Sequence, residues 1–428
     1  MITRFFADNL KVTLIRNSFI AVLWWITFYP GFYSADSFSA IKMAQTGQLN
    51  DSYSAPWAIF VRIFTIEGHE PSIVTLLDVL LLTASVTVFA YSILSQRTAA
   101  IVSTLLGITP LVGAMGITMW HDIPMTSGFL LIITFLIRSL KDSIVTKRNL
   151  IELLLPGAFL ITFRLNGTPT ILILLLLLLF MEIPRSVKAW LASSIVVAVI
   201  FTSLTTLFTT TSPSSILPIS WMAQDISCYA STPAGVGFVE KAIPGVGNTE
   251  TWKSASWCTW FNDSKLSPDE MLASPVKLIS AMGKLVRTDP LFVISLHAKR
   301  NKYLIPGPIY GLPHPPFIHS TIEFPDQGIS WAFPKVVEKA RDYVRLWNFA
   351  SPIFAWSGAW LLFLYIYWFR SRRKDILLIT LLSTVQSLSL LVVAEISDGR
   401  YALFTLIAGQ VLALGLIVDY LSKRKAKL

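Results

Sequence analysis

The chain has 428 residues, of which 54% are hydrophobic and only 14% are charged, and its mean hydropathy is +0.61. A soluble domain of this length needs more charge to cover its surface, so the composition excludes an ordinary soluble protein. The net charge is +10, but no basic motif is interleaved with aromatic residues, so we expect no nucleic-acid partner. The composition predicts an all-α polytopic membrane protein.

Apolar segments long enough, or nearly long enough, to span lipid recur along the chain. In chain order they lie at 14–33, 71–94, 99–119, 125–140, 150–163, 168–182, 189–209, 349–369, 376–395 and 402–420. This pattern predicts about ten transmembrane helices, several of them shorter than the ~20 residues that an untilted helix needs.

The first apolar segment follows Arg4, Lys11 and Arg16, as the core of a signal peptide would. Tyr33 stands three residues before Asp36, where cleavage requires a small residue, so we expect an uncleaved first span. Lysine and arginine gather in alternate connections between spans, which predicts cytoplasmic N- and C-termini in a plasma (inner) membrane. These inner-side residues are Arg97, Arg138, Lys141, Lys147, Arg148, Arg185, Lys188, Arg370, Arg372, Arg373, Lys374, Lys423, Arg424, Lys425 and Lys427.

Two long segments are predicted on the extracytoplasmic side, at about 36–70 and 210–347. The second is rich in Trp, Pro and Gly and too apolar for a disordered linker, which predicts a small folded cap. In its last part, 335–347, helical spacing places the apolar residues on one face and the charged residues elsewhere. This pattern predicts an interfacial amphipathic helix. The chain therefore divides into a membrane module with the first outer loop (1–209), the cap (210–347) and C-terminal membrane helices (348–428).

Both cysteines of the chain, Cys228 and Cys258, lie in the predicted cap. A compartment outside the cytoplasm is oxidising, so their placement favours a disulfide between them.

Asp36 lies just after the first span, in the segment 29–37 (YPGFYSADS). One interpretation is a helix cap, because Asp favours the first turn of a surface helix. The other is catalytic: the nearby Tyr29, Phe32, Tyr33 and Phe38 would desolvate the carboxylate, which makes it a better general base. The two interpretations are compatible, and we favour the catalytic one.

His121 and Asp122 are adjacent in a very short outer turn, so both side chains must face the same outer region. Asp122 precedes Pro124 and could simply begin the next helix. A carboxylate beside an imidazole could instead hold a divalent cation such as Mg or Mn, or orient a phosphate.

Arg164 and Arg400 stand at the predicted outer ends of two spans, where the charge bias disfavours arginine. Snorkelling is one explanation, and binding of an anionic ligand such as phosphate is the other, which we favour. Asp78 lies within the second span, and an acid at that depth is expected either to pair with an arginine or to act in catalysis.

These residues follow one another along the chain in an order, and lie on one side of the membrane, that resemble the layout of the GT-C superfamily of polytopic glycosyltransferases. Members of that superfamily use polyprenyl-phosphate sugars. The residues that carry the resemblance are Asp36 after the first span, the His121-Asp122 turn, Arg164-Leu165-Asn166-Gly167 at a span end, and Arg400-Tyr401 before the last span. In the first outer segment this chain has Ser54-Ala55-Pro56 where many members have His-Pro. The resemblance also implies that the first outer segment forms surface helices.

The resemblance implies an inverting hexosyl or pentosyl transfer on the extracytoplasmic face, typical of cell-envelope polysaccharide synthesis. The donor would be a polyprenyl-phosphate sugar, and the acceptor a glycan, a glycolipid or a protein. Asp36 would be the general base, and His121 and Asp122 would bind the divalent cation. Arg164, Asn166, Arg400 and Tyr401 would bind the donor phosphate.

Two other functions are compatible with many spans and outer arginines. A flippase or transporter of lipid-linked sugars would have broken helices and repeated halves, which the sequence does not show clearly. An O-antigen polymerase or ligase also has a large outer loop, but such enzymes use loop arginines and a histidine rather than an acid after the first span.

Overall fold

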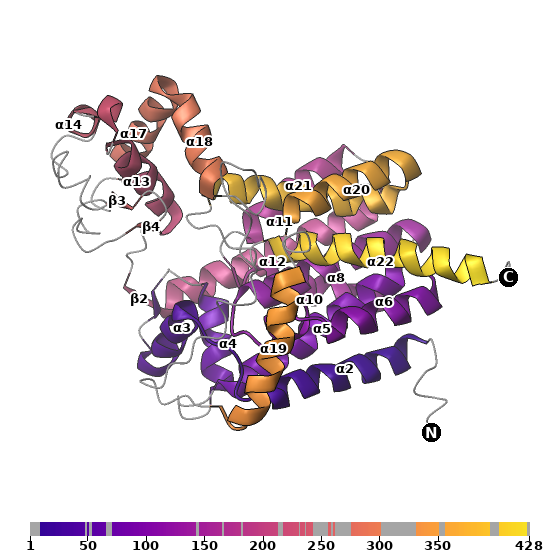
Figure 1. Ribbon diagram of the computed structural model, residues 1–428. Coiled ribbons are helices and arrows are strands. Elements are labelled where there is room, and N and C mark those ends of the chain that lie inside the picture. Colours follow the sequence, from indigo (N-terminus) through magenta and orange to yellow (C-terminus); the bar gives the residue numbers. More distant parts are fainter. Residues whose placement is uncertain are drawn as a thin grey trace.

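Over the residues that it describes, the computed structural model is helical, with four strands of two or three residues (Figure 1). It describes residues 9–47, 49–50, 54–65, 71–142, 145–164, 167–180, 183–212, 217–230, 232–235, 237–242, 256–257, 260–261, 275–300, 331–350, 356–393 and 402–425. Strand β1 (Leu49–Asn50) pairs in parallel with β2 (Thr210–Ser212), and β3 (Ser256–Trp257) pairs antiparallel with β4 (Trp260–Phe261).

Helices of very different length follow one another along the described chain. They are α2 (Leu10–Thr27), α3 (Ala35–Thr46), α4 (Ala55–Phe64), α5 (Ser72–Ile93), α6 (Gln96–Ile108), α7 (Gly113–Gly116), α8 (Asp122–Asp142), α9 (Lys147–Asn149), α10 (Leu155–Ile161, preceded by a π-helical turn at Leu150–Leu154), α11 (Gly167–Leu179), α12 (Arg185–Thr209), α13 (Leu217–Ala230), α14 (Phe238–Ala242), α17 (Pro275–Thr288), α18 (Pro290–Arg300), α19 (Pro334–Ala350), α20 (Ser357–Ser371), α21 (Lys374–Val393) and α22 (Leu403–Lys425).

Six of these helices are long and apolar enough to cross a membrane, namely α2, α5, α8, α12, α21 and α22. The chain is an integral membrane protein. The predicted segments at 150–163, 168–182 and 349–369 correspond to shorter helices in the described part of the chain. The count of about ten spans therefore stays a prediction.

The predicted span 99–119 is wrong in its second half, because α6 ends at Ile108. Thr109 has extended backbone angles and precedes Pro110, and a residue before proline is disfavoured in the helical region. The chain then forms the short α7 and an extended stretch that leads to Asp122. This early end of α6 creates the connection on which the candidate site is built.

Helix α8 is the centre of the membrane region. It packs against α5, α10, α21 and α22, and 89% of its apolar window is buried, so it has little contact with lipid. Gly128 and Gly157 lie where α8 meets α10, and a Cβ on Gly128 would lie 2.8 Å from the Gly157 carbonyl oxygen. Two glycines thus allow these backbones to approach closely.

Helices α13, α14, α17 and α18 form a separate group, seen at the upper left of Figure 1. They share a small core of their own, made by Ala223, Ile226, Tyr229, Ala230, Ala242, Leu278, Ala281, Met282 and Leu285. Cys228 is buried on α13, whereas Cys258 lies outside the described residues, so their pairing stays a prediction.

Helix α19 confirms the amphipathic helix predicted at 335–347, but it packs on α2 rather than on the group formed by α13, α14, α17 and α18. The Tyr343 hydroxyl donates a hydrogen bond to the Ile108 carbonyl, 3.1 Å away, at the end of α6. The predicted cap 210–347 thus contains both the α13, α14, α17 and α18 group and a helix that packs on α2. The boundaries of the cap stay a prediction.

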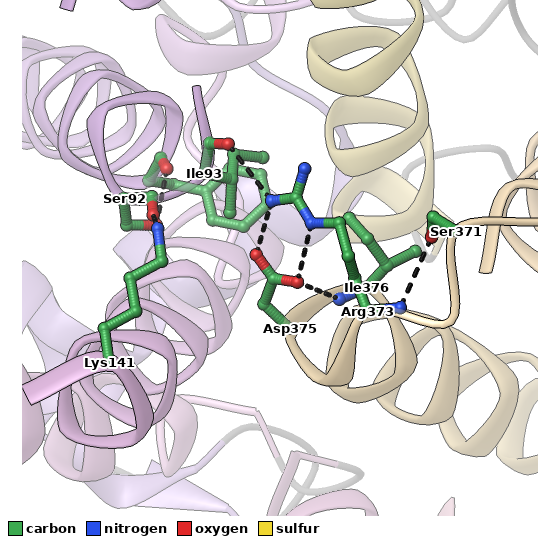
Figure 2. A network of polar contacts seen from close by, with 8 residues as sticks. Ser92, Ile93, Lys141, Ser371, Arg373, Asp375 and Ile376 are labelled. Atoms are coloured by element: carbon green, nitrogen blue, oxygen red, sulfur yellow. Dashed lines mark hydrogen bonds and ion pairs between the residues drawn. The ribbon is translucent and has the colours of Figure 1, made fainter. Parts of the chain in front are cut away.

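Helix α2 begins and α22 ends at the same end of the bundle (Figure 1). We call this the inner end, following the sidedness predicted from charge, and the opposite end the outer end. At the inner end two cations contact the last carbonyls of α5 (Figure 2). Lys141 Nζ lies 2.5 Å from the Ser92 oxygen, and Arg373 Nη2 lies 3.4 Å from the Ile93 oxygen.

These cations complement the partial negative charge at the end of α5, whose last carbonyls have no partner within the helix. Arg373 is oriented by Asp375, which accepts hydrogen bonds from Nη2 and Nε at 2.6 and 3.1 Å. This hydrogen bonding raises the pKa of Arg373 above its ordinary value, so the guanidinium keeps its charge wherever the protein is folded.

We expect Arg373→Ala to lower the stability of the protein by about 0.5–1 kcal/mol, because it removes a cation from a helix C-terminus at a partly exposed position. Thermal unfolding in detergent measures this loss. Arg97→Ala is the matched control, since Arg97 is an exposed inner-end arginine in the first turn of α6. Equal melting temperatures for Arg373→Ala and the parent chain would contradict the role assigned to Arg373.

Candidate functional site

The segment after α2 is joined to the connection before α8. The Phe32 amide donates to the Ile117 carbonyl and the Met119 amide donates to the Phe32 carbonyl, both at 3.0 Å. Gly31 permits this turn because its φ of +121° is a conformation that other residues avoid, and a Cβ there would lie 2.6 Å from Thr75. These contacts bring the first outer segment to the His121-Asp122 turn.

The start of α3 is held at the same place. Ser37 Oγ donates to the Met119 carbonyl at 2.8 Å, and Trp120 Nε1 donates to Ser34 Oγ at 2.7 Å. Ser34 is the residue that precedes α3, and its amide donates to Ser37 Oγ at 2.9 Å. The interpretation of Asp36 as the cap is therefore wrong: the cap is Ser34, and Asp36 lies in the first turn.

Asp36 thus stands between two serines that are both bonded to residues 119–120. Its side chain is partly exposed, and as an acid in the first turn of α3 it is favoured by the helix dipole. The Tyr33 and Phe38 rings that flank it lie 5.9 Å apart, centroid to centroid. The expected desolvation of Asp36 by aromatic side chains stays a prediction.

Asp122 is the first residue of α8 and is completely buried. The Arg164 guanidinium, 14% exposed, forms an ion pair with it. His121 Nε2 lies 3.8 Å from the second carboxylate oxygen of Asp122. Three of the residues singled out in the sequence therefore form one cluster at the outer end.

Helix α4 connects the first outer segment to this cluster from another direction. Ser54 Oγ donates to the Phe163 carbonyl at 2.6 Å, next to Arg164. The Trp57 ring lies 6.3 Å from the His121 ring and 5.9 Å from the Phe163 ring, measured between centroids. The helices α3 and α4 confirm that the first outer segment is helical, and both contact the elements that carry His121, Asp122 and Arg164.

Asp78 lies in α5 and is 1% exposed. Neither of its carboxylate oxygens has a hydrogen-bond partner in the part of the chain that the structure describes. The expected pairing with an arginine is therefore absent there. Asn166, Arg400 and Tyr401 lie outside the described residues, so their predicted donor-binding roles stay predictions.

The residues near Asp122 fit an ion pair better than a metal centre. The carboxylate already contacts a guanidinium, which repels a divalent cation. Among the described residues there is no group of three or more His, Cys, Asp or Glu side chains placed to hold a metal ion. The predicted role of His121 and Asp122 in binding Mg or Mn has no support from this geometry, and we derive no step from it.

A second polar pair, which was not predicted from the sequence, joins α18 to α13. His297 Nε2 lies 2.7 Å from Asp225 Oδ2, and its Nδ1 lies 2.6 Å from the carbonyl oxygen of Leu391 at the end of α21. Both residues are at least nine-tenths buried. The signal in the sequence was an acid and a histidine within two largely apolar segments.

The Leu391 carbonyl oxygen can only accept a hydrogen bond, so Nδ1 of His297 donates to it. His297 also shares a hydrogen bond with Asp225 through Nε2, and it thereby links the α13, α14, α17 and α18 group to the membrane helix α21.

No protein-family model matches the chain, and no curated protein matches it. Among solved structures, the chain is similar to the oligosaccharyltransferase of Archaeoglobus fulgidus in the apo form, with 12% identity and a TM-score of 0.49. It is also similar to the oligosaccharyltransferase AglB of that organism in complex with an inhibitory peptide and a dolichol-phosphate, with 14% identity and a TM-score of 0.47. Each match covers 97% of this chain and 51% of the other, so the chain spans about half the length of these proteins.

This likeness gives no residue of this chain a role.

We expect Asp122→Asn or Arg164→Gln alone to destabilise the protein by about 3 kcal/mol, because each leaves a desolvated charge without its counterpart. The double variant should recover much of that loss. A double-mutant cycle in detergent measures the coupling. The exposed pair Arg148 and Glu152 is the control, for which we expect a coupling of about 0.3–0.5 kcal/mol. Additive effects at Asp122 and Arg164 would contradict the buried ion pair.

We expect Nδ1 of His297 to carry a proton in the folded protein, because the Leu391 carbonyl oxygen beside it can only accept a hydrogen bond. Nitrogen NMR of a sample labelled only at histidine shows which ring nitrogens carry a proton by their two nitrogen shifts. A spectrum of His297→Gln identifies the signal that belongs to His297. Shifts of a neutral ring protonated only at Nε2 would contradict this hydrogen bond.

Proposed function

We propose that this chain is a membrane glycosyltransferase that moves a sugar from a polyprenyl-phosphate donor to an acceptor hydroxyl. The reaction takes place at the outer end, which we place on the extracytoplasmic face. The acceptor is a glycan, a glycolipid or a protein hydroxyl, and the transfer inverts the anomeric centre.

One observation supports this proposal more than any other. Asp36, His121, Asp122 and Arg164 come from three distant parts of the chain, and they are gathered at one end of a membrane bundle. The hydrogen bonds to Ser34 and Ser37 hold the first turn of α3 beside the His121-Asp122 turn. An anchor has no need of ionisable groups collected in this way, whereas an enzyme acting on a lipid-linked substrate needs them at the boundary between lipid and water.

In this proposal Asp36 is the general base. The acceptor hydroxyl must lose a proton as it attacks the sugar, and a carboxylate within hydrogen-bond reach can take that proton. Asp36 suits the role because its side chain is partly exposed while its helix is held rigidly at both serines. The lipid phosphate leaves as an anion, so it requires no strong general acid.

The leaving phosphate needs positive charge nearby. The ion pair with Asp122 offsets the charge of Arg164, so we assign Arg164 chiefly to positioning the His121-Asp122 turn. We assign the neutralisation of the phosphate charge to Arg400, and further donor contacts to Tyr401 and Asn166, because the segment 394–401 follows α21 and precedes α22 in the chain. His121 can add a contact of its own.

A transporter or flippase of lipid-linked sugars is the alternative from another class, and an O-antigen polymerase or ligase is the alternative enzyme. Reconstitution with a labelled polyprenyl-phosphate sugar separates them. Free polyprenyl phosphate that appears together with a glycosylated acceptor indicates transfer, and intact lipid that crosses the bilayer indicates transport.

In the same assay we expect Asp36→Asn to lower the transfer rate at least about 100-fold, because an amide cannot accept the hydroxyl proton. Glu338→Gln is the matched control, since Glu338 is an exposed acid on α19, and it should transfer at the parent rate. Unchanged melting temperatures confirm that both variants fold. Transfer by Asp36→Asn at the parent rate would remove Asp36 as the base.

A further inference from the structure

Helix α17 has an exposed apolar face in addition to its buried one. Its buried face consists of Leu278, Ala281, Met282 and Leu285, which belong to the small core described above. On a neighbouring face Val276, Ile279 and Val286 are exposed by 75%, 53% and 44%. Their spacing of three and seven residues places them in one row along the helix.

The remaining face of α17 is basic. Lys277, Lys284 and Arg287 are all exposed, and the helix contains no acidic residue. The row of apolar side chains therefore has positive charge on one side and the buried core on the other. An apolar strip bordered by lysine and arginine is typical of helices that lie in the surface of an anionic membrane.

The next helix, α18, also has exposed apolar side chains, because Leu291 and Ile294 are exposed by 76% and 63%. The position of α18 relative to the bundle is set by His297, which contacts the Leu391 carbonyl at the outer end of α21. Ile294 and Leu291 are three and six residues before His297, which places them about 5 and 9 Å along the helix from that contact. Leu291 and Ile294 are thus within about 9 Å, along α18, of the contact with the outer end of a membrane helix.

We propose that the exposed face of α17 and α18, formed by Val276, Ile279, Val286, Leu291 and Ile294 with Lys277, Lys284 and Arg287, docks onto the anionic surface of the bilayer that holds the chain. Charge complementarity and the tether to α21 favour a lipid surface over a protein partner. This docking does not depend on the transfer reaction. It would hold the α13, α14, α17 and α18 group against the outer leaflet beside the bundle.

The test uses the full-length chain in lipid nanodiscs with an environment-sensitive fluorophore on Ile279→Cys, and the same label on Thr288→Cys as the control on the basic side of α17. The parent chain treated with the same reagent gives the background from native cysteines. Nitroxide groups on the acyl chains quench a fluorophore that lies in lipid. We expect quenching at position 279 and little at 288, and stronger quenching when phosphatidylglycerol replaces part of the phosphatidylcholine.

A variant with Lys277→Ser, Lys284→Ser and Arg287→Ser keeps the apolar row and removes the charge. We expect it to lose at least about half of the extra quenching that phosphatidylglycerol gives. Equal exposure to water at positions 279 and 288 in anionic nanodiscs would overturn the proposal. A fluorophore at 279 that is shielded from water but not quenched by lipid nitroxides would also overturn it, since a protein or a second copy would then cover this face.

Discussion

Two hydrogen bonds join Phe32 to Ile117 and Met119, and the geometry of the outer end depends on them. They hold the chain that leaves the first span against the connection that enters α8. Two further bonds, from Trp120 to Ser34 and from Ser37 to Met119, then orient the first turn of α3. Since backbone groups away from water must find partners, this pairing also satisfies amides and carbonyls in a region that has no continuous helix.

The Asp122–Arg164 ion pair is a second constraint on the outer end, because a charge removed from water needs an opposite charge beside it. A completely buried carboxylate at the start of α8 is costly without a cation, and Arg164 supplies one from the end of the helical segment 150–161. The pair thereby links α8 to the chain that follows α10. It also lowers the net positive charge that Arg164 can offer to an anionic ligand, which moves the expected phosphate contacts toward the connection between α21 and α22.

The two ends of the bundle use charge differently. At the inner end, Lys141 and Arg373 contact the last carbonyls of α5 and stabilise the C-terminal end of that helix. At the outer end, the acids Asp122 and Asp36 lie in the first turns of their helices, and Asp122 is paired with a cation. The His297–Asp225 pair belongs to neither pattern, because it connects α18 and α13 to a carbonyl of α21.

The sequence by itself determined the class of protein, six of the ten predicted spans and the amphipathic α19, because hydrophobic length and helical periodicity are local properties. The helices of the first outer segment were expected from the resemblance to the GT-C superfamily. It also singled out His121, Asp122 and Arg164, since charges beside apolar segments are conspicuous. Only the tertiary structure decided that Asp122 pairs with Arg164, that Asp78 has no arginine partner among the described residues, and that His297 meets Asp225. Pairing depends on how helices far apart in the sequence pack together, and no local pattern carries that information.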